Sequence, residues 1–312
     1  MTGKIACIFP GQGSQYAGMG KDLADNFKVA RELFQEADDA LSFKISKLCF
    51  EGPEEELKLT TNTQPAILAT SIAAWRVIQS EIGMKADYFA GHSLGEYSAL
   101  VAAGAMPFAD AVRTVRSRGA FMQEAVPVGV GAMAAILSVE ADQLAAICAE
   151  AAQGEVVSPA NFNSPGQIVI AGHATAVNRA IEIAKAKGFR KAMLLPVSAP
   201  FHSSLMVPAG ERLAGVLEAI AISSLQAPVV TNVEAKPNSE STRVKPLLVE
   251  QVSAPVRWEE SVQEMCRLGV GKFLEIGPGK VLSGLVKRIN KEVATANIED
   301  AAGVKALAGE GA

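Results

Sequence analysis

Residues 86–102 read ADYFAGHSLGEYSALVA, and this stretch decides how the chain is interpreted. A short apolar strand is predicted at its start and an alanine-rich helix at its end. Between them, Gly91 to Gly95 fit the pattern G-x-S-x-G, in which a serine stands on a sharp turn between strand and helix. Such a turn strains the serine backbone and presents the hydroxyl at a helix N-terminus, which favours developing negative charge. We therefore predict that Ser93 is a nucleophile and that the Leu94 N–H is an oxyanion donor. The alternative is a glycine-flanked serine that only caps a helix.

A serine nucleophile needs a base, and the chain offers three histidines. His92 adjoins the serine, and neighbours at such a turn point in different directions, so we expect it to pack or to hydrogen-bond structurally. For His173, at a predicted strand-to-helix junction, we expect a capping or surface role. His202 lies in the segment SAPFHSS, where the chain is predicted to return to its larger domain, and active sites are common at such junctions. No aspartate is an obvious third member, so a backbone carbonyl is an alternative orienting group.

The helix predicted over 109–125 carries an arginine on its apolar face. At 100° per residue, that face consists of Ala111, Val115, Arg118 and Met122. The other two arginines of the helix point the opposite way. An arginine within an apolar stripe needs a carboxylate or an equivalent partner. That partner is either a carboxylate of the protein, in a structural ion pair, or the carboxylate of a substrate, which arginine grips through two parallel hydrogen bonds.

A glycine-containing loop follows the first predicted strand and reads PGQGSQY from Pro10 to Tyr16. Tyr16 occupies the position of the third glycine in a dinucleotide-binding loop, and the Gly-Lys-Ser/Thr of a P-loop is absent, so nucleotide binding is weakly supported. The loop still allows a backbone N–H to approach a reacting oxygen. Gln12 is therefore a candidate for the second oxyanion donor.

The order of the predicted elements divides the chain into two parts. Alternating strands and helices predict an α/β fold with a mostly parallel sheet and helices on both faces. Within 128–198 the order β-α-β-β-α-β is typical of a ferredoxin-like unit. We expect a discontinuous large α/β domain over 1–127 and 199–312, with 128–198 inserted as a small subdomain. We also expect a helix over 66–82 and a frayed tail from residue 301.

Composition excludes several classes of protein. The 312 residues are 49% apolar and carry a net charge of −4, so the basic footprint of a nucleic-acid-binding domain is absent. No apolar run approaches the ~18 residues of a membrane span, and the first run is too short for a signal peptide. We expect a soluble, cytoplasmic protein that binds neither membrane nor nucleic acid. The four cysteines are scattered and only three histidines exist, so no zinc site is expected and the thiols are expected to be reduced.

Together, these segments resemble the malonyl-CoA:acyl carrier protein transacylases and the acyltransferase domains of fatty-acid and polyketide synthases. The resemblance covers essentially the whole chain. It rests on FPGQGSQ at 9–15, GHSLGE at 91–96, RG at 118–119, NFNSPGQ at 161–167, FH at 201–202 and LVEQ at 248–251. It implies a hydrolase-like α/β core with a ferredoxin-like insert.

The resemblance also implies a reaction. A malonyl group passes from malonyl-CoA to the phosphopantetheine thiol of holo acyl carrier protein, in a ping-pong mechanism that supplies fatty-acid biosynthesis. Ser93 takes the malonyl group as an ester, His202 is base and then acid, and Arg118 pairs with the free carboxylate. No cofactor is implied beyond the coenzyme A thioester, which is itself a substrate.

Four further residues receive roles from the resemblance. The backbone N–H groups of Gln12 and Leu94 form the oxyanion hole, and the backbone carbonyl of Gln251 orients the histidine. Phe201 narrows the pocket against an α-methyl branch, because phenylalanine here accompanies malonyl selectivity and serine accompanies methylmalonyl selectivity. We expect a monomer.

An acidic carrier protein predicts a basic docking surface, for which ordinary solvated charges are an equal alternative. The candidates are Arg190, Lys191, Lys287, Arg288 and Lys291. Three other functions remain open at this stage. A serine esterase or thioesterase shares the serine turn but normally has an acidic third member and does not need Arg118. A non-catalytic carrier-binding module and an acyltransferase of a polyketide pathway are the other two.

Overall fold

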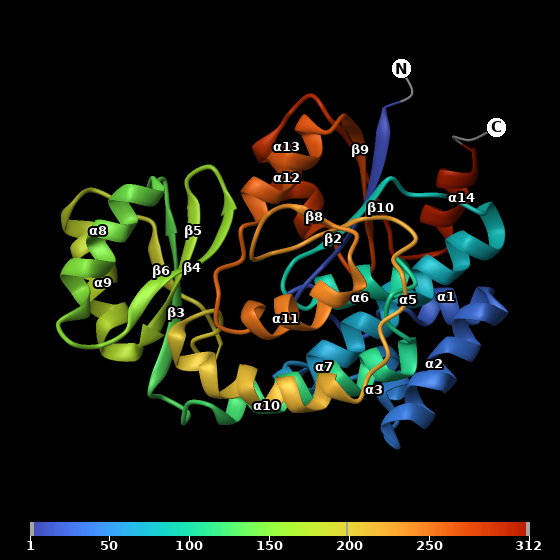
Figure 1. Ribbon diagram of the computed structural model, residues 1–312, viewed down its shortest axis with the longest axis horizontal. Coiled ribbons are helices and arrows are strands. Elements are labelled where there is room, and N and C mark those ends of the chain that lie inside the picture. The colour runs from blue at the N-terminus through green and yellow to red at the C-terminus, as the bar shows by residue number, and fades with distance from the viewer. Residues whose placement is uncertain (1–2, 198, 310–312) are drawn as a thin grey trace.

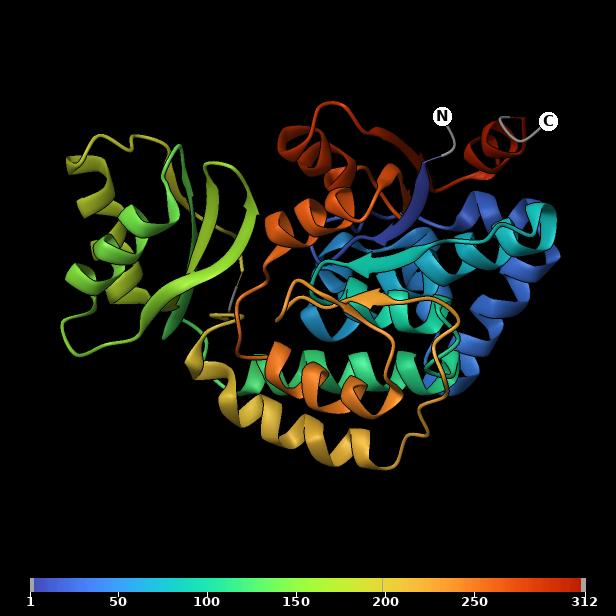
Figure 2. The same ribbon diagram turned by 45° about the horizontal axis from the view of Figure 1, so that its top comes forward.

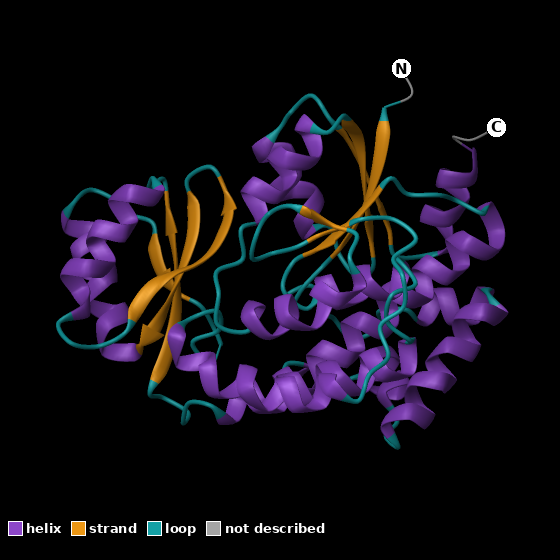
Figure 3. Ribbon diagram, viewed as in Figure 1, coloured by secondary structure: helices purple, strands orange, loops and turns teal. Residues whose placement is uncertain are grey.

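The computed structural model describes residues 3–197 and 199–309, and its strands form two separate sheets (Figures 1 and 3). The larger sheet has the order β10-β9-β1-β2-β7-β8, and its neighbours run parallel except β7 and β8. Its strands are β1 (Lys4–Phe9), β2 (Tyr88–Gly91), β7 (Val229–Val230), β8 (Pro237–Asn238), β9 (Val270–Ile276) and β10 (Ala294–Ile298). The predicted α/β class with a mostly parallel sheet is confirmed.

Helices cover both faces of the large sheet, as the alternation of apolar side chains along β1 requires. Ala6 and Ile8 pack with Trp258 on one side, and Cys7 and Phe9 belong to the cluster on the other side. The helices of this part are α1 (Lys21–Asn26), α2 (Lys28–Leu41), α3 (Ile45–Glu51), α4 (Glu54–Leu57), α5 (Thr60–Ile82), α6 (Gly95–Ala102), α7 (Phe108–Glu124), α10 (Val207–Glu218), α11 (Ser241–Gln251), α12 (Trp258–Arg267), α13 (Val281–Ile289) and α14 (Ala301–Gly309), with a 3₁₀ turn, η1 (Ser204–Met206).

The smaller sheet is antiparallel throughout, in the order β4-β5-β3-β6. Its chain order is β3 (Gly131–Leu137), α8 (Ala141–Ala152), β4 (Val157–Ser164), β5 (Gln167–His173), α9 (Ala174–Ala186) and β6 (Ala192–Leu194). Both helices cover the outer face, and the other face is turned toward the rest of the molecule (Figures 1 and 2). The predicted domain limits at residues 1, 198 and 312 lie outside the described residues.

Two local predictions were wrong. The helix predicted over 66–82 begins at Thr60, so Pro65 lies inside it. The proline ring removes one backbone donor, and the Thr63 hydroxyl fastens this end by donating to the Leu57 carbonyl at 2.6 Å. The tail predicted to fray from residue 301 forms α14, because Val304 is buried and the Ala301 N–H donates to Asp22 Oδ2 at 2.7 Å.

Over the described range, no helix combines the length and apolar character needed to cross a membrane. The four cysteines are free; Cys7, Cys49 and Cys148 are buried, and Cys266 is partly buried.

Candidate active site

The turn between β2 and α6 holds Ser93 in the strained conformation that the sequence predicts. Its φ angle is 52°, in the left-handed region that non-glycine residues rarely adopt. The flanking glycines are required by close packing: a Cβ at Gly91 would lie 2.0 Å from the Gly95 carbonyl carbon, and one at Gly95 would lie 2.1 Å from the Phe9 oxygen. The chain can therefore turn here only with glycine at both positions.

Ser93 and His202 meet across the site. The serine Oγ lies 2.8 Å from the histidine Nε2. On the other side of the ring, Nδ1 lies 2.9 Å from the Gln251 carbonyl oxygen and 3.1 Å from that of Ala254. Because both carbonyls can only accept, Nδ1 carries the proton and Nε2 is free to accept the serine proton. A backbone carbonyl thus stands where an acidic side chain is usual.

The environment of His202 keeps its ring neutral. Burial lowers its pKa to about 3, with further lowering by the charge of Arg118 and by His92, while the carbonyls of Gln251 and Ala254 oppose the shift. A neutral ring is the form that can accept a proton.

The other two histidines stand apart from the serine hydroxyl. His92 Nε2 lies 2.8 Å from Asn163 Oδ1, a contact that joins the serine turn to β4. His173 precedes α9, and its Nδ1 accepts the Val156 N–H at 2.9 Å.

Arg118 is buried, with 1% of its surface exposed, and points at the serine. One Nη donates to Gln64 Oε1 at 2.9 Å, and the other donates to Ser93 Oγ and Gln251 Oε1, each at 3.0 Å. Its Nε has no hydrogen-bond partner. None of the ion pairs among residues 3–197 and 199–309 includes Arg118. The guanidinium is therefore a buried cation held by neutral oxygens, which favours a carboxylate ligand from outside.

A cavity of about 190 Å³ opens onto these groups. Gln12, Leu94 and Phe201 line it together with Ser93, Arg118 and His202. Side chains from the smaller sheet form its opposite wall, among them Met133, Asn161 and Val169. Gln251 lies behind the wall, with no exposed surface, and acts through its contacts with His202 and Arg118.

Three residues at the site were not singled out from the sequence. Gln64 binds Arg118, Asn232 Oδ1 accepts the Ser93 N–H at 2.6 Å, and Glu96 Oε2 accepts the Gln251 Nε2–H at 2.8 Å. Glu96 stands inside the recognised GHSLGE segment, so a signal existed for it. Asn232 follows a two-residue strand far along the chain, and nothing local marks it.

Metal ligands are not gathered at this site. No group of three or more histidine, cysteine, aspartate or glutamate side chains suited to hold a metal ion occurs in the described part of the chain. The polar groups that are present are a serine hydroxyl, a neutral imidazole and a buried guanidinium, a combination suited to acyl transfer from a substrate that carries a carboxylate.

Comparison with known proteins agrees with this geometry. The acyl transferase domain family matches residues 6–309. The malonyl CoA-acyl carrier protein transacylase of Bacillus subtilis (strain 168) is 53% identical over 298 residues, which cover 95% of this chain and 94% of the relative. That of Salmonella typhimurium is 48% identical over 303 residues, covering 97% and 98%.

Solved structures agree as well. An acyl carrier protein S-malonyltransferase from Vibrio cholerae has a TM-score of 0.95 at 48% identity, covering 97% of this chain and 99% of that one. A malonyl-transacylase in complex with its type II PKS acyl-carrier protein has a TM-score of 0.96 at 49% identity, covering 99% and 100%. The chain belongs to the acyl transferase family, among the malonyl CoA-acyl carrier protein transacylases.

Proposed function

We propose that this protein transfers a malonyl group from malonyl-CoA to the phosphopantetheine thiol of holo acyl carrier protein, through a malonyl ester on Ser93. The observation that carries the proposal is the buried Arg118, which lies 3.0 Å from the nucleophile oxygen and forms no ion pair within 4.0 Å among the described residues. A malonyl group differs from an acetyl group by a carboxylate, which is the ligand this cation is missing.

In the first half-reaction, Ser93 Oγ attacks the thioester carbonyl while His202 Nε2 takes the hydroxyl proton. The backbone N–H groups of Gln12 and Leu94 stabilise the oxyanion. When the C–S bond breaks, the imidazolium gives its proton to the leaving thiolate, so coenzyme A departs as the free thiol. The malonyl group remains as an ester on Ser93.

The second half-reaction reverses these roles. His202 takes the proton of the phosphopantetheine thiol, and the thiolate attacks the serine ester. The proton then returns to the serine oxygen as the ester bond breaks. No cofactor enters either step, and the protein alternates between free and malonylated forms in a ping-pong sequence.

Selectivity rests on two side chains. Acetyl-CoA would leave Arg118 buried without an anion, which costs several kcal/mol. Phe201 is 8% exposed and lines the cavity beside His202, where it reduces the room for an α-methyl branch. Comparable turnover of methylmalonyl-CoA and malonyl-CoA by the wild-type protein would contradict this role of Phe201.

The finer assignments extend this proposal. We assign the large part as a hydrolase-like α/β domain over 1–127 and 199–312, and the insert over 128–198 as a ferredoxin-like subdomain. The order β4-β5-β3-β6, with both helices on one face, supports the second name. We expect a cytoplasmic monomer.

Carrier docking is assigned to exposed basic side chains on the small part and on α13. The candidates are Arg190, Lys191, Lys287, Arg288 and, just beyond α13, Lys291, and all five are exposed. Charge reversal at these positions with no change in the KM for carrier protein would contradict the assignment.

A polyketide pathway is the second candidate, and one observation favours it. A relative solved with a type II PKS carrier protein is 49% identical to this chain, and the Salmonella typhimurium malonyl CoA-acyl carrier protein transacylase is 48% identical. We assign fatty-acid synthesis, and the preferred carrier protein separates the two pathways. A plain esterase is disfavoured because Arg118 would then have no ligand.

The experiment is intact-protein mass spectrometry after brief incubation with malonyl-CoA or acetyl-CoA. Wild type should gain one malonyl adduct, which holo acyl carrier protein removes. Ser93→Ala should gain none, and Ser98→Ala, a control at a neighbouring buried serine, should behave as wild type. An adduct that forms equally from acetyl-CoA and is lost to water would show an esterase instead.

A further inference from the structure

A buried carboxylate, Glu96, contacts the supports of both the nucleophile and the base. It lies in the first turn of α6 and is 2% exposed. Its Oε2 accepts the backbone N–H of Asn232 at 3.0 Å and the Nε2–H of Gln251 at 2.8 Å. These two partners come from segments of the chain far apart in sequence.

The first partner holds the serine turn. Asn232 Oδ1 accepts the Ser93 N–H at 2.6 Å, and Asn232 Nδ2 donates to the Gly91 carbonyl at 2.7 Å. Because β7 ends at Val230, the side-chain amide continues the hydrogen bonding of the β2–β7 pair beyond the last strand residue. It thereby fixes the two peptide groups that set the position of the strained serine.

The second partner holds the base and the cation. Gln251 Oε1 accepts from Arg118, its backbone oxygen faces His202 Nδ1, and its Nε2 also donates to the Ser93 carbonyl at 3.0 Å. An amide could present either end to Arg118. Because Glu96 Oε2 is an acceptor, the NH₂ end of the Gln251 amide must face Glu96. The oxygen end of that amide must therefore face the guanidinium.

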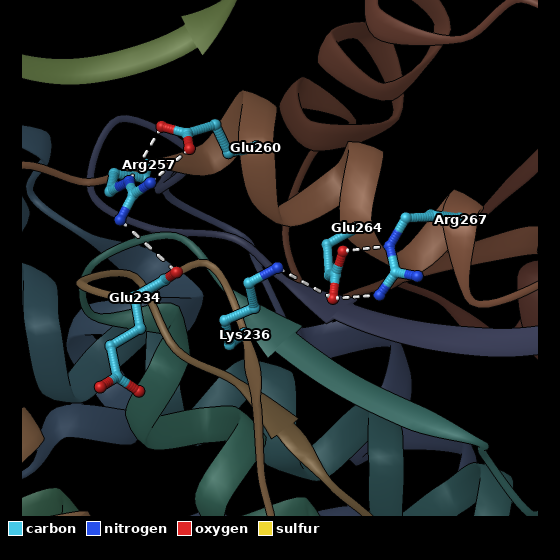
Figure 4. Close-up of polar contacts among 6 residues, drawn as sticks. All are labelled: Glu234, Lys236, Arg257, Glu260, Glu264 and Arg267. Atoms are coloured by element: carbon cyan, nitrogen blue, oxygen red, sulfur yellow. Dashed lines mark hydrogen bonds and ion pairs between the residues drawn. The ribbon is translucent and has the colours of Figure 1, made fainter.

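The loop that follows Asn232 is also held at the surface, where Figure 4 shows Arg257 hydrogen-bonded to the Glu234 carbonyl. The Arg257 N–H donates to the Asn232 carbonyl at 3.1 Å, and its Nη1 donates to the Val233 carbonyl at 3.2 Å. The guanidinium is itself paired with Glu260, and the nearby Glu264 pairs with Lys236 and Arg267. These surface charges pair with one another, and together they hold the loop in place.

We propose that Glu96 is a positioning residue of this active site: a single carboxylate oxygen sets Asn232 under Ser93 and sets the amide of Gln251 against Arg118 and His202. The inference rests on the proposed function. Two routes of hydrogen bonds start at Glu96. The serine branch runs through Asn232 to Ser93, and the arginine branch runs through Gln251 to Arg118 and His202. Loss of Glu96 loosens both branches, whereas loss of the Asn232 side chain loosens only the first.

Single-turnover acylation by malonyl-CoA and by acetyl-CoA tests the two branches. Glu96→Ala should slow acylation at saturating malonyl-CoA by about 100-fold, because a small displacement of the nucleophile has that effect. It should also reduce the preference for malonyl over acetyl. Asn232→Ala should slow both substrates by the same factor and leave the preference unchanged. Glu96→Gln keeps an oxygen that can accept both hydrogen bonds, so its rate should stay within about fivefold of wild type, the worth of one hydrogen bond.

Asp38 supplies the matched control, since it is a buried carboxylate that accepts two hydrogen bonds from Ser46, pairs with Lys44 at 3.3 Å and does not line the cavity. Asp38→Ala should lower the unfolding temperature but acylate at the wild-type rate. Wild-type acylation in Glu96→Ala, or an equal loss in Asp38→Ala, would overturn the inference. If Glu96→Ala does not fold, Asn232→Ala and Glu96→Gln decide it: a wild-type rate in the first, or a 100-fold loss in the second, overturns it. If the wild-type protein forms no malonyl ester, the proposed function fails instead.

Discussion

The two sheets contribute to the cavity in different ways. The part built on the six-stranded sheet supplies the three groups to which we assign the roles of nucleophile, proton acceptor and anion-binding cation: Ser93, His202 and Arg118. The four-stranded part supplies neutral wall residues, such as Met133 and Val169. This difference shows that two tasks are separable here. One part holds the reacting side chains, and the other part encloses the cavity above them.

The two parts are nevertheless held in register close to the base. Val256 forms a bridge with Asn161 of β4; its N–H donates to the Ala160 carbonyl at 2.8 Å, and its own carbonyl accepts the Phe162 N–H at 2.9 Å. Val256 lies two residues beyond Ala254, whose carbonyl contacts His202. The wall is thus attached to the segment that orients the histidine.

The largest effect should follow removal of the base. His202→Ala should lower kcat/KM for malonyl-CoA by about 10²- to 10⁴-fold, because general base catalysis is worth roughly this much. His173→Ala, in the four-stranded part, is the control and should retain activity. Rapid-quench measurement of Ser93 acylation gives both rates, and comparable losses in the two variants would show that the parts are not separable.

Next in size is the loss of the cation. Arg118→Met should lower kcat/KM for malonyl-CoA by roughly 30-fold or more, since a buried charge pair loses at least about 2 kcal/mol when one partner is truncated. Acetyl-CoA should lose little. Removing the Arg118 charge, which lowers the pKa of His202, should also move the acid limb of acylation to higher pH.

Arg113→Met is the control, because Arg113 lies on the same helix, is half exposed and pairs with Asp110. Equal losses for malonyl-CoA and acetyl-CoA in Arg118→Met would assign this arginine a purely structural role.

The stability of the two parts should also depend differently on pH, because Glu96 lies in the part built on the six-stranded sheet. Burial raises the pKa of Glu96 to about 7, although the Asn232 and Gln251 hydrogen bonds and the Arg118 charge oppose the shift. The unfolded chain releases this proton near 4.5, so the folded state holds the extra proton between these values. Protonated Glu96 therefore contributes fully to the free energy of unfolding below pH 4.5. That contribution, about 3 kcal/mol in total, is lost as pH rises through 7.

Urea unfolding of wild type and Glu96→Gln between pH 5 and 8, taken as a difference, isolates this group. As pH rises, the free energy of unfolding of wild type should fall relative to that of Glu96→Gln. A difference independent of pH would mean that Glu96 titrates alike in both states. Val177→Ala, in the core of the four-stranded part, should give a difference that does not vary with pH, because the buried acidic side chains of the described residues, Asp38, Glu96 and Glu275, all lie in the other part.

The sequence was enough to predict which side chains meet at the cavity, namely Ser93, His202 and Arg118. Ser93 stands in a five-residue pattern that only one backbone geometry satisfies, and Arg118 was found because helical periodicity placed it on an apolar face. The carbonyl alternative for orienting His202 followed from the lack of an aspartate. The first two inferences use neighbours within one or two turns of the chain, whereas the third uses the residue inventory of the whole sequence.

The supports could not be predicted in the same way. Asn232 reaches Ser93 across 139 positions, and its role depends on β7 lying beside β2. The tail was misjudged for a related reason: the composition near residue 301 predicts fraying, yet a contact with Asp22 orders it. Tertiary register decides such positions, and a single sequence does not display it.

The smallest effect should come from the wall. Asn161 is 7% exposed, lines the cavity, and its Oδ1 has no hydrogen-bond partner. Because a neutral hydrogen bond to the substrate is worth about 1 kcal/mol, Asn161→Ala should raise KM about fivefold for malonyl-CoA and for acetyl-CoA alike. Neither kcat nor the preference should change, since the reacting groups lie in the other part. Asn178→Ala, exposed on α9, should leave KM at the wild-type value. A fall in kcat with unchanged KM would mean that the wall positions reacting atoms through its bridge to Val256, and the separation of reactivity from enclosure would no longer hold.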